Sequence, residues 1–213
     1  ILEKNPIVGG MCTGWYRKGF YLDGCMHWLT GTKPNTELHD MWRNIGAFDS
    51  QEEIVYLDSW GAFEYAGKTV TFWRDLEKAE KEWLEISPKD EKQIKFFFKC
   101  VRKVRSFELP LETLPKILPI YRMMRMVKDA IMTFPHYEII MKMSCEDFAS
   151  KFHHPALRWA ISHAQPGDGN LYSMIYSYAT ICDDNGGLLK GGSLKLADNI
   201  RKYFLYSGGT LRT

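Results

Sequence analysis

The first 31 residues contain the side chains whose types and spacing are best suited to chemistry. Glu3 follows two apolar residues that are typical of a strand end, and a glycine pair, Gly9-Gly10, comes soon after it. An acid at the end of a strand is one way to hold a ribose, and paired glycines let the backbone approach a bound group closely. A basic turn at Arg17 follows, and then Asp23 with the residues just beyond it. This stretch has the composition of a binding loop rather than of a core.

Each of these residues also has a purely structural interpretation. Glu3 can be a surface acid after a strand, and the glycine pair can be a simple turn. Arg17 and its neighbour Lys18 can form a solvated turn, which is the commoner fate of such a pair. His27, a candidate catalytic residue, is equally well explained as a structural histidine.

Other functional classes find little support in the sequence. The net charge is +2 with the histidines neutral, which is too balanced for a nucleic-acid partner. His153 and His154 have no acid or cysteine at ligand spacing, so no metal is expected there. We find no G-x-S-x-G motif and no recognisable cysteine–histidine pair, so nucleophilic catalysis is not supported.

The cysteines and the hydrophobic runs indicate a compartment. There are five cysteines, an odd number, and none forms a C-x-x-C motif. They are therefore expected to be reduced thiols of a cytoplasmic protein. No apolar run approaches the length of a membrane span, and we expect no secretory signal, since no basic start is followed by an apolar stretch.

The middle of the chain has the periodicity of helices. Apolar spacing predicts helices over 36–45, 75–86, 87–107, 120–133, 144–153, 155–163, 171–182 and from about 193 to 206. Ser87 followed by Pro88 is expected to cap the third of these. Strands are predicted over 54–57 and 63–72, with a hairpin turn at 66–68, and another strand after Gly208-Gly209. In 63–72, apolar Val70 and Phe72 are expected to face the core and the alternating threonines to face solvent.

Three regions follow from this order: 1–50, 51–184 and 185–213. The first and last share a glycine-rich style that the middle lacks, so we expect them to form one domain that a mainly helical lobe interrupts. Both ends of the sequence look like cuts, and we expect the chain to be an excerpt of a longer protein. The expected fold class is α+β and helix-rich.

The glycine-rich ends together resemble a known family. Glu3, Gly9-Gly10 and the run from Gly19 to Gly24 are similar to the flavin-binding oxidoreductases that include phytoene desaturases, carotenoid isomerases, retinol saturases and flavin amine oxidases. The stretch from Gly191 to Asp198, closing with Gly208-Gly209-Thr210, resembles the helix and strand that return to the adenine side in that family. The two stretches cover roughly a quarter of the chain and stand in the family's order.

The resemblance implies a partial, Rossmann-like FAD/NAD(P)-binding domain with an inserted helical lobe that binds an apolar small molecule. It implies FAD for the intact protein and desaturation, saturation or isomerisation of carbon–carbon bonds, or amine oxidation. The family's G-x-G-x-x-G phosphate loop would lie before Glu3, so this chain alone is expected to be inactive and to expose apolar surface that favours self-association. The implied cofactor-binding residues are Glu3, Gly9, Gly10, Met11, Arg17, Asp23 and Gly24, and the implied substrate-lining residues are Met123, Met124 and Met126.

One alternative from another class stays open. The predicted helix over 87–107 has a basic face, and a methionine-rich segment follows it. These features are also expected of a non-catalytic helical module that docks a partner or the surface of a membrane. A basic face is most often simply solvated, and methionines most often fill irregular packing.

Overall fold

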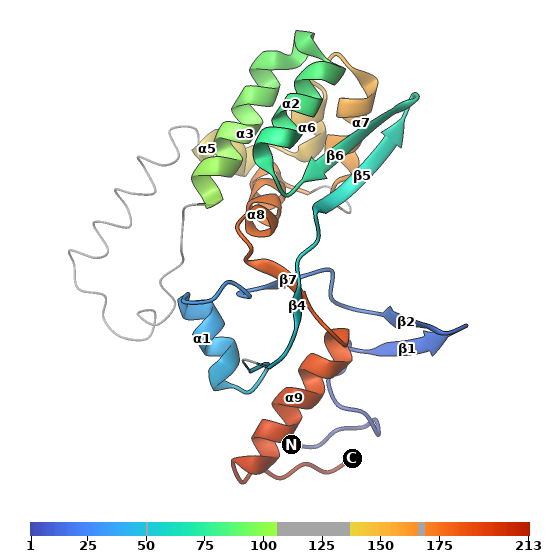
Figure 1. Ribbon diagram of the computed structural model, residues 1–213, viewed down its shortest axis with the longest axis vertical. Helices are drawn as coiled ribbons and strands as arrows, with labels where there is room; N and C mark the ends of the chain where they lie inside the picture. Colours follow the sequence, from blue (N-terminus) through green and yellow to red (C-terminus); the bar gives the residue numbers. More distant parts are fainter. Residues whose placement is uncertain (50, 106–136, 166–168) are drawn as a thin grey trace, which may run out of the picture. The chain divides into compact units, whose positions relative to one another are not determined.

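The computed structural model of the chain describes residues 1–49, 51–105, 137–165 and 169–213 (Figure 1). The protein is a helix-rich mixture of helices and small antiparallel sheets, which confirms the predicted combination of the two element types. The predicted helix over 120–133, with Met123, Met124 and Met126, lies outside the described residues.

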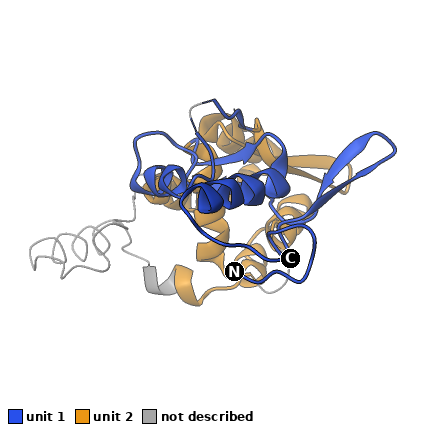
Figure 2. Ribbon diagram, turned by 90° about the horizontal axis from the view of Figure 1, so that it is seen from below, with its two compact units in different colours: residues 1–56, 184–213 blue, residues 57–183 orange. Residues whose placement is uncertain are grey.

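Contacts divide the chain into two compact units (Figure 2). Unit 1 combines residues 1–56 with 184–213, and unit 2 consists of residues 57–183. The divisions predicted from sequence lay after residues 50 and 184. The two glycine-rich ends of the chain therefore belong to one unit, and the role of each unit stays a prediction.

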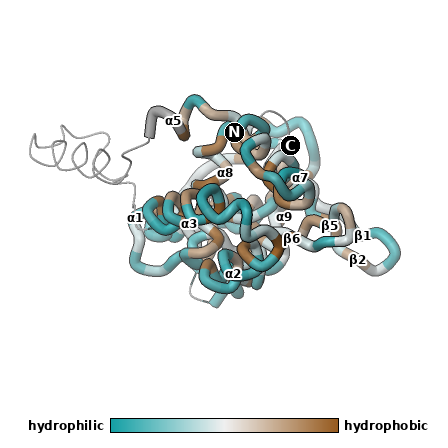
Figure 3. Tube along the Cα trace, turned by 90° about the horizontal axis from the view of Figure 1, so that it is seen from above, coloured by the Kyte–Doolittle hydropathy of each residue, from teal (hydrophilic) through white to brown (hydrophobic). Residues whose placement is uncertain are grey.

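Unit 2 contains most of the helices. Its hairpin consists of β5 (Ser59–Tyr65) and β6 (Lys68–Trp73). Its helices are α2 (Leu76–Ile86), the short 3-10 helix η1 (Pro88–Asp90), α3 (Glu91–Arg105), α5 (Tyr137–Lys142), α6 (Cys145–Ala149), α7 (Pro155–His163) and α8 (Leu171–Cys182). In Figure 3, hydrophobic and hydrophilic residues alternate along α2 and α3, as expected for helices with one buried face.

An aromatic cluster fills the centre of unit 2. Phe72, Trp83, Phe97 and Tyr178 are fully buried, and their rings contact one another with centroids 4.9–6.5 Å apart. Such pairs add to the large apolar area that each ring removes from water. The Tyr178 hydroxyl donates to the Trp73 carbonyl at 2.5 Å, so its polar end is satisfied.

The hairpin of unit 2 confirms the predicted turn and corrects the predicted exposure. Thr71 is buried like Val70 and Phe72, although it points to the opposite face from them. Helix α2 lies along the free edge of β6 at this residue: the Glu82 carboxylate accepts from the Thr71 amide at 2.8 Å, and the Trp83 indole donates to the Thr71 carbonyl at 3.1 Å. The prediction that Thr71 faces solvent was wrong, because the strand's own pattern gave no sign of the helix that packs beside it.

The start of α3 differs from the prediction as well. Ser87 does not cap the helix with its side chain; its hydroxyl donates to the Asp90 carboxylate at 2.8 Å. Residues 88–90 form the separate turn η1, and the α-helix begins at Glu91. The carboxylate of Asp90, which is fully buried, competes successfully for the hydroxyl that the capping signal assigned to the backbone.

Unit 1 holds shorter elements. They are β1 (Gly14–Arg17), β2 (Phe20–Asp23), β3 (Leu29–Thr30), α1 (Glu37–Asn44), β4 (Ile54–Val55), β7 (Gly186–Leu189) and α9 (Gly192–Tyr206). β1 and β2 form a hairpin, and β7 lies between β3 and β4 in an antiparallel sheet. The interpretation of 1–31 as a loop was therefore wrong at β1, β2 and β3, and no strand was predicted where β7 occurs.

The core of unit 1 is small. Its buried apolar residues are Leu29, Ala47, Phe48, Leu189 and Leu196. Hydrogen bonds between distant segments supplement this core: the Trp42 indole donates to the Thr30 carbonyl at 2.8 Å, and the Gly187 amide donates to the Thr32 hydroxyl at 2.9 Å. Among the described residues, no helix has both the length and the apolar character that crossing a bilayer requires.

Candidate functional site

The two ends of the chain meet beside Glu3. Leu2 pairs with Arg212 in a parallel bridge, in which the Glu3 amide donates to the Arg212 carbonyl at 2.8 Å and the Arg212 amide donates to the Ile1 carbonyl at 3.0 Å. The strands of the described sheets pair antiparallel, so this bridge stands apart from them. Arg212 lies where a strand was predicted to begin after Gly208-Gly209, although the structure contains only the single bridge there.

The Glu3 side chain is half-buried at the carboxyl end of this pairing. Its Oε1 accepts hydrogen bonds from the Asn5 amide at 2.9 Å and from the Asn5 Nδ2 at 3.3 Å. These bonds fix the turn that follows the bridge, and they orient the carboxylate just beyond the end of the paired segment. An acid in this place can accept hydrogen bonds from a ribose.

The glycine pair is needed for two separate reasons. Both residues have positive φ, 106° for Gly9 and 57° for Gly10. A Cβ on Gly9 would lie 2.7 Å from the Cβ of Ala197 in α9, so this glycine permits close packing of the loop on the helix. Around Gly10 nothing lies within 4 Å of an added Cβ, so the space on that side of the residue is open. Met11, the next residue, is 83% exposed.

Arg17 lies at the end of the β1–β2 hairpin. It pairs with Phe20 across the turn formed by Lys18 and Gly19, whose φ values of 51° and 83° suit a two-residue hairpin turn. The side chains of Arg17 and Lys18 are exposed. This geometry agrees with the solvated-turn interpretation, and it leaves the guanidinium accessible to an anionic ligand.

Asp23 joins the opening segment to α9. Its Oδ2 accepts from the Ser193 amide at 2.6 Å, and its Oδ1 accepts from the Ser193 hydroxyl at 2.6 Å. The amides of Cys25 and Met26 also donate to Oδ1, at 2.9 and 3.1 Å. Partial burial by itself would raise the pKa of Asp23, but these hydrogen bonds outweigh it and lower the pKa below its usual value. Asp23 is thus a positioning residue for the first turn of α9.

Gly24 and His27 continue the same segment. A Cβ on Gly24 would lie 2.9 Å from the Trp15 ring and 3.1 Å from the Thr13 carbonyl oxygen, so the hairpin requires a glycine there. His27 is exposed, and its ring lies 6.1 Å from that of Trp28. No group of three or more histidine, cysteine or acidic side chains that could hold a metal occurs among the described residues.

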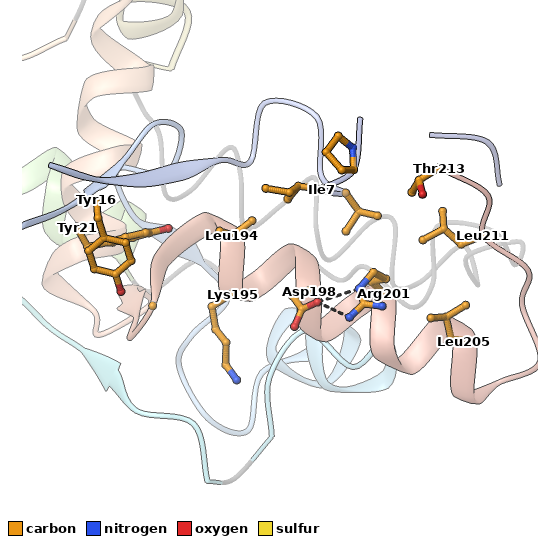
Figure 4. Close-up of a pocket in the computed structure, with 13 residues that line it drawn as sticks. Ile7, Tyr16, Tyr21, Leu194, Lys195, Asp198, Arg201, Leu205, Leu211 and Thr213 are labelled. Atoms are coloured by element: carbon orange, nitrogen blue, oxygen red, sulfur yellow. Dashed lines mark hydrogen bonds and ion pairs between the residues drawn. The ribbon is translucent and has the colours of Figure 1, made fainter. Parts of the chain in front are cut away.

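A cavity of about 730 Å³ lies in unit 1, between the opening segment and α9 (Figure 4). Ile7 and Val8 line one side, and Tyr16 and Tyr21 of the hairpin, with ring centroids 5.3 Å apart, line one end. Its volume is within the usual range for a small-molecule site. The lining residues are Pro6, Ile7, Val8, Tyr16, Tyr21, Gly191, Leu194, Lys195, Asp198, Arg201, Leu205, Leu211 and Thr213.

The charges in this cavity belong to α9. Asp198 accepts from Arg201 Nε at 2.8 Å and from Arg201 Nη2 at 2.7 Å, and it also pairs with Lys202 at 2.8 Å. Lys195 pairs with Glu52 at 3.1 Å. The hydrogen bonds and charges of Lys202 and Arg201 lower the pKa of Asp198. The cavity thus combines aromatic and aliphatic groups with charged groups of both signs, in which Arg201 and Lys195 are already paired with acids.

None of the candidate cofactor-binding residues, and not His27 either, lines this cavity, although Gly191 and Asp198 at the two ends of the second resembling stretch do. The candidate residues lie on the segments that surround it: Ile7 and Val8 stand between Glu3 and Gly9, and Tyr16 precedes Arg17. Sequence reasoning missed Ser193 and the polar residues of α9. The glycine pair directly before Ser193 could have indicated a helix start that needs a partner for its free amides, although it could not name Asp23 as that partner.

The basic face of α3 is partly neutralised. Lys95 pairs with Glu91 at 2.5 Å, and Arg102 pairs with Glu80 of α2 at 2.6 Å. Two of the cations that would dock a membrane or an acidic partner therefore already have acidic neighbours. Nothing in the described part of unit 2 favours the docking module over a solvated helix face.

Comparison with known proteins does not name a family for this chain. No family model matches it, and no curated protein matches it.

Proposed function

We propose that unit 1 is part of the cofactor-binding domain of an FAD-dependent oxidoreductase that acts on an apolar substrate. The single observation that carries this proposal is the parallel pairing of Leu2 with Arg212, with the carboxylate of Glu3 directly beyond it. Parallel strands with an acid at a carboxyl end are the setting in which Rossmann-like domains hold the ribose of a dinucleotide. The resemblance of both glycine-rich ends to flavin oxidoreductases supports the same interpretation.

The described residues fit parts of such a cofactor. Glu3 would accept hydrogen bonds from the ribose, and the open backbone at Gly10 leaves room for a ligand to approach. Arg17 offers an exposed cation, and Met11 offers an exposed apolar side chain. Asp23 and Gly24 would act indirectly, because Asp23 orients α9 and Gly24 permits the hairpin. FAD would supply the redox step, in which electrons pass between the flavin and a carbon–carbon or carbon–nitrogen bond.

The proposal assigns unit 2 to the substrate. Met123, Met124 and Met126 stay the proposed lining of its apolar site, and His27 stays a candidate catalytic residue. The proposed setting is the cytoplasm, with contact to a membrane surface as one route by which an apolar substrate arrives. No nucleic-acid partner is proposed.

The test is the absorption spectrum of the natural reading frame that contains residues 1–213, purified after FAD is supplied. We expect the absorbance bands of a bound flavin, and a colourless folded protein would contradict the proposal. Glu3→Gln should then weaken FAD binding about tenfold or more, because a hydrogen bond to a carboxylate contributes about 1.5–3 kcal/mol.

Glu53→Gln is the matched control for that measurement. It removes the same charge from unit 1, at an exposed side chain that pairs with Lys190 at 2.7 Å. We expect FAD affinity to stay unchanged in this variant. Equal losses in the two variants would show that Glu3 contributes only net charge, and the ribose assignment would be wrong.

A further inference from the structure

Two cysteines of unit 1 lie close together although they are thirteen positions apart in sequence. The Sγ atoms of Cys12 and Cys25 are 3.9 Å apart. Cys25 is exposed and Cys12 is half-buried, whereas the other three cysteines are buried in unit 2. All five are free thiols in this structure.

The hairpin register explains why these two side chains meet. Gly14 pairs with Asp23, and the Gly24 amide donates to the Thr13 carbonyl at 2.8 Å, which continues the same register by one pair. Cys12 and Cys25 are the next residues on the two sides, just beyond the strand ends at Gly14 and Asp23. Cys12 lies in a turn, where its amide donates to the Gly9 carbonyl at 2.9 Å. The sulfur atoms of a disulfide are about 2.05 Å apart, so the two side chains would have to approach each other further for the bond to form.

We propose that Cys12 and Cys25 are a redox-sensitive dithiol that forms a reversible disulfide when a small-molecule disulfide oxidises it. This site lies beyond the proposed function and does not depend on FAD. The thiolate of the exposed Cys25 attacks the small-molecule disulfide, which forms a mixed disulfide and releases one small thiolate. The Cys12 thiolate then attacks the Cys25 sulfur and releases the second. In total, both cysteine thiols lose a proton and are oxidised to one disulfide, and the oxidant is reduced to two thiols.

Differences in burial indicate which cysteine attacks the oxidant, which one resolves the mixed disulfide and which ones stay unreactive. Burial and the contact with Cys25 raise the pKa of the Cys12 thiol, which suits the resolving rather than the attacking position. Burial raises the pKa of Cys100 and of Cys145 to about 11, so these thiols stay protonated and unreactive near neutral pH. The resulting disulfide would tie the loop that follows the glycine pair to the segment next to Asp23.

The test treats the full chain with oxidised glutathione and then blocks free thiols before digestion. Trypsin cuts after Arg17 and Lys18, so a Cys12–Cys25 bond joins two separate peptides and is identified directly by mass. We expect that linked pair, an intact mass lower by two hydrogen atoms, and full reversal by dithiothreitol. Cys12 and Cys25 that both stay free, or that both carry glutathione as the final products, would overturn the proposal.

Two single variants test the order of the steps. Cys12→Ser should accumulate glutathione on Cys25, because no neighbouring thiol resolves the mixed disulfide. Cys25→Ser should react much more slowly, at Cys12. A circular dichroism spectrum that matches that of the unsubstituted chain shows that each variant is folded. A Cys12→Ser chain that is folded and fails to take up glutathione would contradict the attacking role of Cys25, and linkage of Cys25 to any other cysteine would overturn the pair itself.

Discussion

Two aspartates, one in each unit, accept four hydrogen bonds each in very different surroundings. Asp90 of unit 2 is fully buried and accepts from the Ser87 hydroxyl, the His153 amide, the His153 Nδ1 and the His154 amide at 2.7–3.0 Å. Asp23 of unit 1 is exposed and accepts from two groups of Ser193 and from the amides of Cys25 and Met26 at 2.6–3.1 Å.

The difference shows what each unit relies on. Asp90 joins the start of α3 to the segment before α7, next to a core of buried aromatic and aliphatic side chains. Without the Asp90 carboxylate, the donors of Ser87, His153 and His154 would have no acceptor there. The hydrophobic core would still hold the helices of unit 2 together. Unit 1 has a small core, so the hydrogen bonds of Asp23 and a few other long-range hydrogen bonds contribute a larger share of the stability of its fold. The unit that carries the proposed cofactor residues is the one that depends more on individual polar contacts.

The largest expected effect is that of Asp90→Ala. We expect the free energy of unfolding of unit 2 to fall by about 2–4 kcal/mol, because each donor left without an acceptor away from water costs about 1–3 kcal/mol. Urea unfolding followed by tryptophan fluorescence measures it. Asp58→Ala is the control, since that side chain is 91% exposed and its ion pair with Arg74 spans 3.9 Å. A loss no larger than that of the control would mean that the Asp90 network is dispensable.

Asp23→Ala is expected to have a smaller effect, about 1–2 kcal/mol, because solvent can replace part of what its donors lose. Its location makes the effect local. Hydrogen exchange should accelerate in the first turn of α9 and in β2, and it should stay unchanged in α3 and α8. Asp40→Ala, an exposed acid of α1, is the matched control within unit 1. Acceleration in both units together would show that they unfold as one, and the contrast between them would be wrong.

The helices of unit 2 were predictable because their signals are local. The predicted ranges 155–163 and 171–182 coincide with α7 and α8, and 75–86 differs from α2 by one residue. Apolar periodicity sets the buried face, and caps such as Asp75 and Asn170 mark the starts. The burial of Thr71 could not be predicted in this way, since it depends on where Glu82 and Trp83 lie.

Unit 1 was harder to predict because its contacts are distant in sequence. β3 pairs with β7 through Leu29 and Gly187, and Asp23 meets Ser193. Short strands rich in glycine have little apolar periodicity, so the pattern predicted none of the four strands β1, β2, β3 and β7. Candidate residues such as Glu3 and Gly9 were found from type and spacing, but the fit of Gly9 against Ala197 required the fold.

Acid should produce the smallest of the three effects on stability. Burial would raise the pKa of Asp90, but its hydrogen bonds lower it below the usual value, and the same balance lowers the pKa of Asp23. A lowered folded pKa stabilises the protein above the unfolded value of about 3.9, and this contribution is lost as the pH falls through the folded pKa. A protonated carboxyl group still accepts some hydrogen bonds, so the loss is smaller than on truncation. We therefore expect unfolding free energies measured from pH 7 to pH 3 to decrease less in Asp90→Asn than in the unchanged chain. If the two plots of unfolding free energy against pH run parallel, the charge of Asp90 contributes nothing to stability, and its contribution comes only from uncharged hydrogen bonds and packing.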